Sequence, residues 1–336
     1  MKAVVLVGGE GTRLRPLTET VPKPLVDFLD RPFLHVVLDH LSANGVEEAV
    51  LSSPYLESRF APFLDARRGT APAITWITED EPLGTAGAIA NALPHLDGPV
   101  FVLNGDILTD LDLRALAGRH RDTGAVATIT LTPVEDARPY GLVVTEGTRV
   151  VEFREKPEEA VPGQVNAGTY VLEPEALAGV PAGRSVSIER EVFPALIASG
   201  QMVSSFVSDA YWLDLGTPER YLQAHADVLE GRVRGFDVVA PFVAEGAEVD
   251  VRAHLGRRVV LGPGAVVAAG AVVEDSIVQR GARVGEEARV TGSILGPGSE
   301  VGRGASLAGA VLGEGARVAP GTVSEGDRVG PGETLD

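Results

Sequence analysis

Leu261-Gly262-Pro263-Gly264 opens a stretch of sequence whose pattern returns, at equal intervals, at Val278, Leu295 and Leu312. Within each stretch an aliphatic residue recurs in steps of six, and a glycine keeps one fixed phase. A short fixed period predicts a solenoid, in which the aliphatic side chains point inward and stack, while glycine permits the corners. The stacked residues are Leu261, Val267, Val273, Val278, Val284, Val290, Leu295, Val301, Leu307, Leu312 and Val318.

The same pattern extends backward in steps of six to Leu255, Val249 and Val243. Three such hexapeptides make a triangular coil, and the repeat resembles a left-handed parallel β-helix, whose usual coil holds three full hexapeptides. The interval from Leu261 to Val278 falls a single residue short of that length, which predicts that one corner of each coil is shortened. We predict a left-handed β-helix domain over residues 240–336.

The chain up to about residue 235 follows a different pattern. Short apolar runs such as Ala3–Val7 and Val100–Asn104 alternate with helical stretches such as Leu56–Ala66. This alternation favours β-α-β units and a mostly parallel sheet with helices on both faces. Residues 142–153 indicate a β-hairpin inserted in that sheet. We predict a Rossmann-like, mixed but mostly parallel α/β domain over residues 1–232.

Charge and composition exclude several classes of function. The 336 residues include 47 acidic and 29 basic side chains, which gives a formal net charge of -18. Such a balance opposes binding to nucleic acid or to an anionic membrane. The absence of cysteine excludes disulfides, a thiolate nucleophile and a zinc–thiolate site. The longest apolar run near the start, Ala3–Val7, is far too short to span a membrane, and we expect a soluble cytoplasmic protein.

A glycine-rich turn follows the first expected strand, with the sequence Gly8-Gly9-Glu10-Gly11-Thr12-Arg13. Backbone N–H groups in such a turn can approach a phosphate chain, and Arg13 and Lys23 add positive charge. Only three basic residues are lysines, namely Lys2, Lys23 and Lys156. A chain so biased toward arginine is expected to keep lysine where a compact ammonium is needed. The glycine spacing matches neither a strict Rossmann fingerprint nor a Walker A motif.

The full string, Gly-Gly-x-Gly-Thr-Arg-Leu-x-Pro-Leu-Thr from Gly8 with a following Pro22-Lys23-Pro24, resembles the signature of the sugar-1-phosphate nucleotidyltransferases. The resemblance covers the whole chain. It implies transfer of a nucleotidyl group to a sugar 1-phosphate with Mg²⁺ as cofactor, and the likeness is greatest to enzymes that use GTP and mannose 1-phosphate. Further matching segments follow in the family's order: Glu81–Ala88, Asn104–Asp106, Tyr140-Gly141, Phe153–Pro157, Asn166–Gly168, Ser187–Glu189 and Trp212–Gly216.

The resemblance also implies roles for individual residues. Arg13 would contact the leaving pyrophosphate, Lys23 the α-phosphate and Lys156 the sugar phosphate. Asp106, just past an expected strand, and Asp214 would hold the metal, since Mg²⁺ prefers carboxylate and phosphate oxygens. Nucleotide contacts fall on Leu6, Gly8, Gly9, Gly11, Thr12, Glu79, Gly84 and Thr85, and sugar contacts fall on Gly141, Glu155 and Asn166. The role of Glu189 stays open, because a capping residue would look the same.

The choice of base depends on Glu79. Family members that use thymidine or uridine triphosphates tend to carry glutamine at this position. A carboxylate only accepts hydrogen bonds, and the guanine edge offers two adjacent donors, so Glu79 favours GTP. An acidic run in an exposed loop is the alternative interpretation of Glu79-Asp80-Glu81.

Other functions stay open within and outside the family. A thymidylyl- or uridylyltransferase acting on glucose 1-phosphate, or a guanylyltransferase acting on a heptose 1-phosphate, would carry the same motifs. A non-catalytic sensor of nucleotide sugars is disfavoured, because Arg13, Lys23, Asp106, Lys156 and Asp214 are all present. Acyl transfer by the β-helix is also disfavoured, since His254 is the only histidine after Gly235. We expect a homo-oligomer formed through the β-helix.

Overall fold

The computed structural model describes residues 1–54 and 57–336. The chain divides into two compact units. The first, here called the sheet unit, comprises Met1–Gly8 and Val36–Trp212; the second, the solenoid unit, comprises Gly9–His35 and Leu213–Asp336. The start of the expected helix Leu56–Ala66 lies outside the described residues. Among the helices described, none is both long and apolar enough to cross a membrane.

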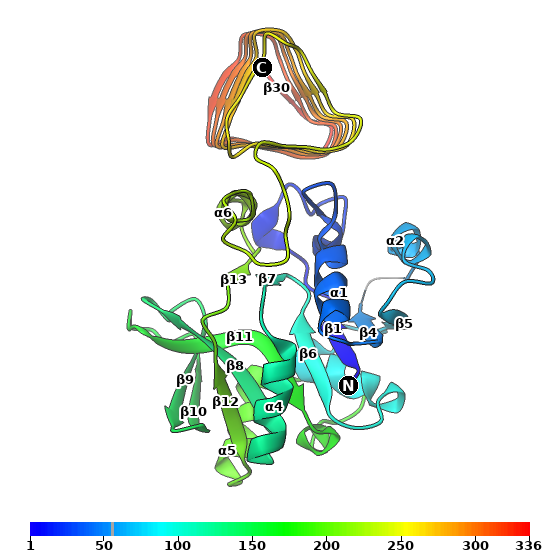
Figure 1. Ribbon diagram of the computed structural model, residues 1–336, viewed down its shortest axis with the longest axis vertical. Helices are drawn as coiled ribbons and strands as arrows, with labels where there is room; N and C mark the ends of the chain where they lie inside the picture. The colour runs from blue at the N-terminus through cyan, green and yellow to red at the C-terminus, as the bar shows by residue number, and fades with distance from the viewer. Residues whose placement is uncertain (55–56) are drawn as a thin grey trace. The chain divides into compact units, whose positions relative to one another are not determined.

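A nine-stranded sheet forms the centre of the sheet unit (Figure 1). β1 (Ala3–Leu6) lies between β4 (Glu48–Ser53) and β6 (Val100–Asn104), and β5 (Ala73–Thr78) lies at the outer edge; these four strands pair in parallel. The remaining strands are β8 (Ala127–Val134), β9 (Gly141–Glu146), β10 (Arg149–Glu155), β11 (Gly163–Leu172) and β12 (Val203–Val207). β11 runs antiparallel to β6 and β8, so the mixed α/β sheet predicted from the sequence is confirmed.

Helices cover this sheet and bury its apolar side chains. α3 (Gly84–Ala92) contacts β1 and β4, α4 (Leu113–Thr123) contacts β8 and β12, and α5 (Phe193–Ala198) contacts β10 and β12. The side chain of Asp112 caps α4 by accepting the N–H groups of Arg114 and Ala115. The unit also contains α2 (Ala61–Ala66) and β7 (Ile107–Thr109). The fully buried core includes Val4, Val102, Ile129, Tyr170 and Phe193.

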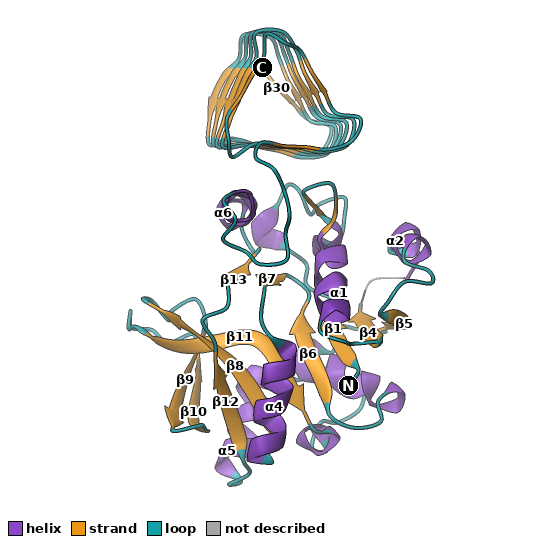
Figure 2. Cartoon of the chain, in the orientation of Figure 1, coloured by secondary structure: helices purple, strands orange, loops and turns teal. Residues whose placement is uncertain are grey.

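Residues from Phe242 onward form a parallel β-helix with three sheets, one on each side of a triangular coil (Figure 2). Phe242 pairs with Val260 and Val260 pairs with Ile277, so the first coil is a residue longer than the second, and later coils keep the shorter length. The strands are β14 (Phe242–Val243), β15 (Glu248–Val249), β16 (His254–Leu255), β17 (Val260–Leu261), β18 (Val266–Val267), β19 (Val272–Glu274), β20 (Ile277–Val278), β21 (Arg283–Val284), β22 (Arg289–Thr291), β23 (Ile294–Leu295), β24 (Glu300–Val301), β25 (Ser306–Ala308), β26 (Val311–Leu312), β27 (Arg317–Val318), β28 (Val323–Glu325), β29 (Arg328–Val329) and β30 (Thr334–Leu335).

From the second coil onward, the shortened corner lies just before the sheet formed by β14, β17, β20, β23, β26 and β29. Asp275 occupies it with φ of 49°, and the next coils place Gly292 and Gly309 there with φ of 58° and 65°. Hydroxyl groups stitch these corners together, because Ser276 Oγ accepts the N–H of Ser293 at 3.0 Å. The inward aliphatic ladder is buried as the period predicts.

The solenoid unit also contains two stretches outside the coils, residues 9–35 and the segment from Leu213 to the first coil. The 3₁₀ turns Thr12–Leu14 and Lys23–Leu25 lead into the short strands β2 (Asp27–Phe28) and β3 (Arg31–Pro32). The helix that follows, α1 (Phe33–Ala43), starts in the solenoid unit and continues in the sheet unit from Val36. β13 (Trp212–Asp214) and α6 (Pro218–Leu229) precede the coils. Phe28 packs against the rings of Tyr221 and His225 of α6, with centroids 6.5 and 4.1 Å away. These ring contacts anchor the segment after the glycine-rich turn to α6.

Candidate active site

Residues 9–27, here called the signature loop, fold so that Gly11 lies against Thr18 and Lys23 in the solenoid unit. Gly11 has φ of 64°, and an added Cβ would lie 3.0 Å from both Lys23 Cβ and Thr18 Cγ2. Thr18 Oγ1 donates a hydrogen bond to the carbonyl of Gly11 at 2.8 Å. Glycine is therefore needed here for its backbone conformation and for the close approach of Lys23.

Three cationic side chains surround the carboxylate of Asp214. Lys23 Nζ lies 3.7 Å from Oδ1, and an Arg13 guanidinium nitrogen lies 3.7 Å from Oδ2. Arg220 donates a hydrogen bond to Oδ2 at 3.0 Å. The side chains of Lys23 and Asp214 are only 8% and 17% exposed. The cluster is locally positive in a chain of strongly negative net charge, which suits an anionic ligand.

Asp214 also fits a metal ligand. Its Oδ1 is buried and has no hydrogen-bond partner among the residues described. A buried carboxylate oxygen in this state can accept a further bond at little cost. Within the described ranges, no group of three or more His, Cys, Asp or Glu side chains could hold a metal by itself. A metal here would therefore complete its shell with substrate oxygens, as Mg²⁺ commonly does.

The carboxyl ends of β1 and β6 lie side by side in the sheet unit. Leu6 pairs with Asn104, and the N–H of Gly105 donates to the Leu6 carbonyl at 3.0 Å. An added Cβ on Gly105 would lie 2.8 Å from that carbonyl oxygen, so the turn requires glycine. Asp106 is thereby held at the edge of the sheet where α/β proteins bind ligands. Gly8 lies two residues beyond Leu6, and its Cβ would meet Pro54 Cδ at 2.5 Å.

Gly141, Glu155 and Asn166, the three expected sugar contacts, come together from neighbouring strands. Gly141 pairs with Glu155, and Leu142 pairs with Val165 next to Asn166. A Cβ on Gly141 would lie 2.9 Å from Glu155 Oε2, so this carboxylate lies directly over the glycine. The Asn166 amide is oriented by two bonds, from its Nδ2 to the Tyr170 hydroxyl and from the Gly168 N–H to its Oδ1.

Lys156 immediately follows this cluster in an unusual backbone conformation. Its φ is 52°, in the left-handed region, and its N–H donates to the Tyr140 carbonyl at 2.9 Å. A non-glycine residue in this region costs of order 1 kcal/mol, so the surroundings must hold it there. The Lys156 side chain is exposed and leaves from the same strand end as Glu155.

Glu189, whose role the sequence left open, joins two expected site segments. Its Oε2 accepts hydrogen bonds from Thr85 Oγ1 and Ser187 Oγ, each at 2.8 Å. Burial, and next the negative charge of Glu189, raise the pKa of Glu155. Gly84, at the start of α3, packs against the same segment, since a Cβ there would lie 2.7 Å from the Val186 carbonyl. Glu189 thus links Thr85 to the capping Ser187 and is an electrostatic neighbour of Glu155.

Glu79 is buried rather than displayed on an exposed loop. Its carboxylate accepts a hydrogen bond from Ser52 Oγ at 2.9 Å on Oε1 and from the Leu83 N–H at 3.0 Å on Oε2. Only 5% of the residue is exposed. Each oxygen keeps a second lone pair, so Glu79 braces the turn before α3 and can still accept a bond from a ligand.

Arg220 is the site residue that the sequence reasoning missed. It lies in the first turn of α6, six residues after Asp214, and belongs to none of the matched motifs. The only sequence cue is an arginine one helical turn after the capping Thr217. Gly9 and Thr12, by contrast, are exposed positions of the signature loop, where backbone N–H groups can meet a ligand.

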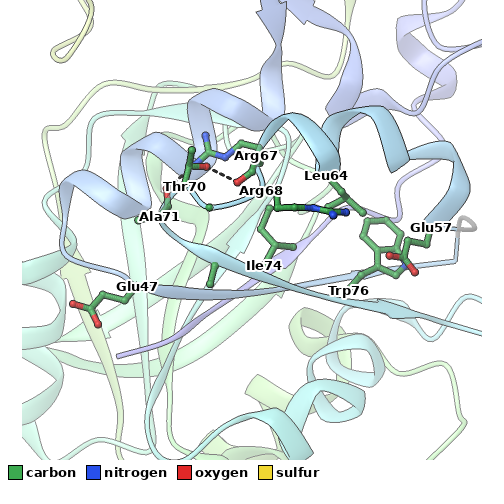
Figure 3. Close-up of a pocket in the computed structure, with 11 residues that line it drawn as sticks. Glu47, Glu57, Leu64, Arg67, Arg68, Thr70, Ala71, Ile74 and Trp76 are labelled. Atoms are coloured by element: carbon green, nitrogen blue, oxygen red, sulfur yellow. Dashed lines mark hydrogen bonds between the residues drawn. The ribbon is translucent and has the colours of Figure 1, made fainter.

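A separate cleft lies beside edge strand β5, beneath α2 (Figure 3). Its volume is about 540 Å³, and its described lining includes Glu47, Arg68 and Trp76. Arg67 is fixed there by bonds to Asp39 Oδ1 and the Ala71 carbonyl, both 2.6 Å. The expected site residues are absent from this described lining, so the cleft is distinct from the candidate site.

Comparison with known proteins identifies the relatives of this chain. A family profile described as Nucleotidyl transferase matches residues 2–231, and one described as GMPPB C-terminal domain matches residues 239–336. The chain is 40% identical over 293 residues to mannose-1-phosphate guanylyltransferase of Mycobacterium tuberculosis, covering 86% of this chain and 78% of the relative. It is 38% identical over 304 residues to mannose-1-phosphate guanylyltransferase 1 of Arabidopsis thaliana, covering 86% and 84%. Among solved structures it is similar to HddC from Yersinia pseudotuberculosis complexed with GMP-PN, with a TM-score of 0.58, 30% identity, and coverage of 66% of this chain and 97% of that chain.

Proposed function

Because this chain belongs to the nucleotidyl transferase family, we propose that it transfers the GMP group of GTP to mannose 1-phosphate. A phosphate oxygen of mannose 1-phosphate attacks the α-phosphorus in line. The bond from that phosphorus to the bridging oxygen breaks, and pyrophosphate leaves with the electron pair, so the products are GDP-mannose and pyrophosphate. The attacking phosphate has a second pKa of about 6 and is largely ionised at pH 7. The reaction therefore needs positioning and charge neutralisation more than a general base.

The cluster around Asp214 is the observation that carries this proposal. Lys23, Arg13 and Arg220 all lie within 3.7 Å of one carboxylate. A triphosphate brought to this cluster meets an excess of positive charge on a glycine-rich loop whose backbone donors can also bind phosphate. We assign Arg13 to the departing pyrophosphate and Lys23 to the α-phosphate.

Mg²⁺ is the proposed cofactor, with Asp214 and Asp106 as its protein ligands; when bound, it would neutralise charge on the phosphates and align them. The buried, hydrogen-bond-free Oδ1 of Asp214 supports this assignment. Lys156 would hold the phosphate of the sugar substrate, since its ammonium is a compact point charge on a long exposed stem.

Contacts to the nucleoside and the sugar complete the proposed site. Leu6, Gly8, Gly9, Gly11, Thr12, Gly84 and Thr85 would bind the nucleotide, mainly through backbone groups, and Glu79 would accept from the guanine edge. On the sugar, Glu155 and Asn166 would bind hydroxyl groups, and the absence of a side chain on Gly141 would let the ring approach the backbone.

Pyrophosphate release in the presence of Mg²⁺ tests the proposal. GTP, dTTP, UTP and ATP are each crossed with mannose 1-phosphate and glucose 1-phosphate. We expect a large preference for GTP with mannose 1-phosphate and loss of release in EDTA, with recovery on adding Mg²⁺. A preference for dTTP or UTP with glucose 1-phosphate would contradict the base and sugar assignments. Nucleotide binding without turnover would favour a heptose 1-phosphate substrate or a sensor of nucleotide sugars.

We also propose a cytoplasmic homo-oligomer in which the catalytic domain spans residues 1–232 and the β-helix spans residues 240–336. The first coil supports association, because its ladder residues Val243 and Val249 are 45% and 37% exposed, unlike their equivalents in inner coils. Light scattering of the full chain, compared with a Val243→Asp, Val249→Asp variant, tests this point.

A further inference from the structure

One corner of the β-helix departs from the repeat. The residues after the strands of the β14–β29 sheet are Gly262-Pro263, Gly296-Pro297 and Gly330-Pro331 in three coils, Gly313-Glu314 in another, and Ala244-Glu245 after the first strand. After β20 the corresponding residues are Gln279-Arg280. Only after β20 are both residues of this corner long and polar, whereas the first of the two is glycine or alanine in every other coil.

Both of these side chains contact segments outside the coils but inside the solenoid unit. Arg280 binds the carboxylate of Asp27 with two hydrogen bonds of 2.8 Å, and Asp27 is only 9% exposed. Gln279 donates from Nε2 to the Tyr221 hydroxyl at 2.9 Å, and that hydroxyl donates to the Asp27 carbonyl. A bidentate arginine–carboxylate pair is directional as well as strong, so it fixes orientation.

Arg328 makes a second connection from the same face. It continues an outward ladder formed by Ile277, Ile294 and Val311, which are at most 5% exposed although they lie outside the interior core. Arg328 donates to the Arg15 carbonyl at 3.2 Å and lies 3.7 Å from Glu219 of α6. Apolar residues on this face are therefore covered, and polar ones at its margins bind the signature loop and α6.

The two connections attach to the signature loop at points close in sequence to its two cationic residues. Arg15 is the residue that ends the turn carrying Arg13, and Asp27 lies four residues after Lys23. We propose that Arg280, Gln279 and Arg328 are positioning residues for nucleotidyl transfer, which act by fixing the loop that presents Arg13 and Lys23. This inference rests on the proposed function of those two cations. It makes the solenoid a part of the catalytic apparatus and not only an assembly element.

The size of the effect follows from what the loop must do. Phosphate-binding groups act only when they are held close to the productive geometry, and a misplacement of 1 Å can cost about 100-fold in rate. Removing the Arg280–Asp27 pair leaves the loop attached through Arg328 and through the packing of Phe28, so the loss should be partial. We therefore expect kcat to fall about tenfold in Arg280→Met.

Steady-state kinetics on the full-length protein test the proposal. Arg280→Met should lower kcat and leave KM for the sugar 1-phosphate unchanged, because that substrate's expected contacts do not lie on the signature loop. Arg280→Lys keeps the charge but loses the bidentate geometry, so its kcat should lie between the values of the wild type and Arg280→Met. The double variant Asp27→Asn, Arg280→Met should be no worse than either single variant. Arg252→Met, which removes an ion pair confined to the first coil, is the matched control.

Hydrogen exchange of residues 9–27 gives a readout that does not need turnover. Exchange should become faster in Arg280→Met and stay unchanged in Arg252→Met. Equal kcat for these two variants, or unchanged exchange of the loop, would overturn the inference. A wild-type protein that binds GTP but turns over no substrate would contradict the proposed function, while the exchange measurement would still report on the loop.

Discussion

The ammonium nitrogen of Lys23 lies 3.7 Å from Oδ1 of Asp214, beyond hydrogen-bond range, although both side chains are largely buried. Buried charges usually pair closely, because each loses its hydration. The separation here leaves the Asp214 oxygen without a hydrogen bond in the described structure. Such an arrangement suits a site whose charges are completed by a ligand.

Lys23→Met should therefore lower kcat/KM for pyrophosphate release by about 100- to 1,000-fold, the usual loss for a donor that stabilises developing charge. Folding should be little affected, since the substitution keeps the length of the side chain. Lys2→Met is the control, because Lys2 has its own ion pair with Glu48 at 3.2 Å. Unchanged kcat/KM in Lys23→Met would remove Lys23 from the proposed mechanism.

Glu79→Gln should weaken the preference for GTP over dTTP by about tenfold, because one acceptor oxygen becomes a donor. Ser52→Ala distinguishes base recognition by Glu79 from its structural role. This variant removes the internal hydrogen bond to Glu79 Oε1 and leaves the carboxylate in place. The ratio of kcat/KM values for the two nucleotides is the measurement. If Ser52→Ala changes the ratio as much as Glu79→Gln does, the role of Glu79 is structural.

Binding of the sugar phosphate should depend on pH through Glu155. The pKa of this carboxyl is raised, mainly by burial and then by Glu189, so its charged form is lost at a higher pH than for an ordinary glutamate. KM for the sugar 1-phosphate should therefore rise in acid, beginning at a higher pH than an ordinary glutamate would give. Glu189→Gln removes the negative neighbour, lowers the pKa of Glu155 and should move this rise to lower pH. The substrate's own ionisation is common to both proteins, so identical profiles would contradict the assignment.

Stability should fall in mild acid because of His225. Burial lowers its pKa to about 4, and the Leu29 N–H donates to its Nε2 at 3.1 Å, which requires the neutral ring. The unfolded chain takes up the proton near pH 6.5 and the folded chain only near pH 4, so stability is lost as pH falls between these values. The loss between pH 7.5 and 5 should be about 2 kcal/mol by linkage.

Urea denaturation at these two pH values measures the effect. In His225→Gln the difference in unfolding free energy between the two should shrink, and His254→Gln, at an exposed position of the solenoid, should behave like wild type. An unchanged pH dependence in His225→Gln would assign the acid sensitivity to other groups.

The solenoid was predictable in detail because its physical cause is periodic. One inward aliphatic residue per hexapeptide determines the ladder, and the missing residue in each coil is accommodated at the corner of Asp275, Gly292 and Gly309. The motif turns were predictable for a related reason. Gly11, Gly105 and Gly141 each lie where a Cβ would come within 3.0 Å of a neighbour, so the sequence can hardly vary there.

Contacts between segments far apart in the chain were not predictable. Glu79 was compatible with an exposed acidic loop, and its burial depends on Ser52, which carries no motif. Arg220 gives no sign of its bond to Asp214. The Gln279-Arg280 exception is visible in the repeat, but its partner Asp27 lies far earlier in the chain. The periodicity of the repeat predicts which residues face the interior of the β-helix, but it does not predict which segments pack on its outer faces.

The equal coils from β20 to β29 restrict how this protein can change in length. Coils advance by one strand spacing, about 4.8 Å. Arg280 follows β20 and Arg328 lies in β29, three coils later, so the two anchors are about 14 Å apart along the axis. The number of coils between Arg280 and Arg328 therefore sets the distance between the two contacts with the signature loop. Removing or adding one coil between Arg280 and Arg328 would keep the inward ladder intact, but it would displace Arg328 from Arg15 by about 4.8 Å along the axis. The number of coils between Arg280 and Arg328 is therefore constrained by the two contacts that these residues make with the signature loop.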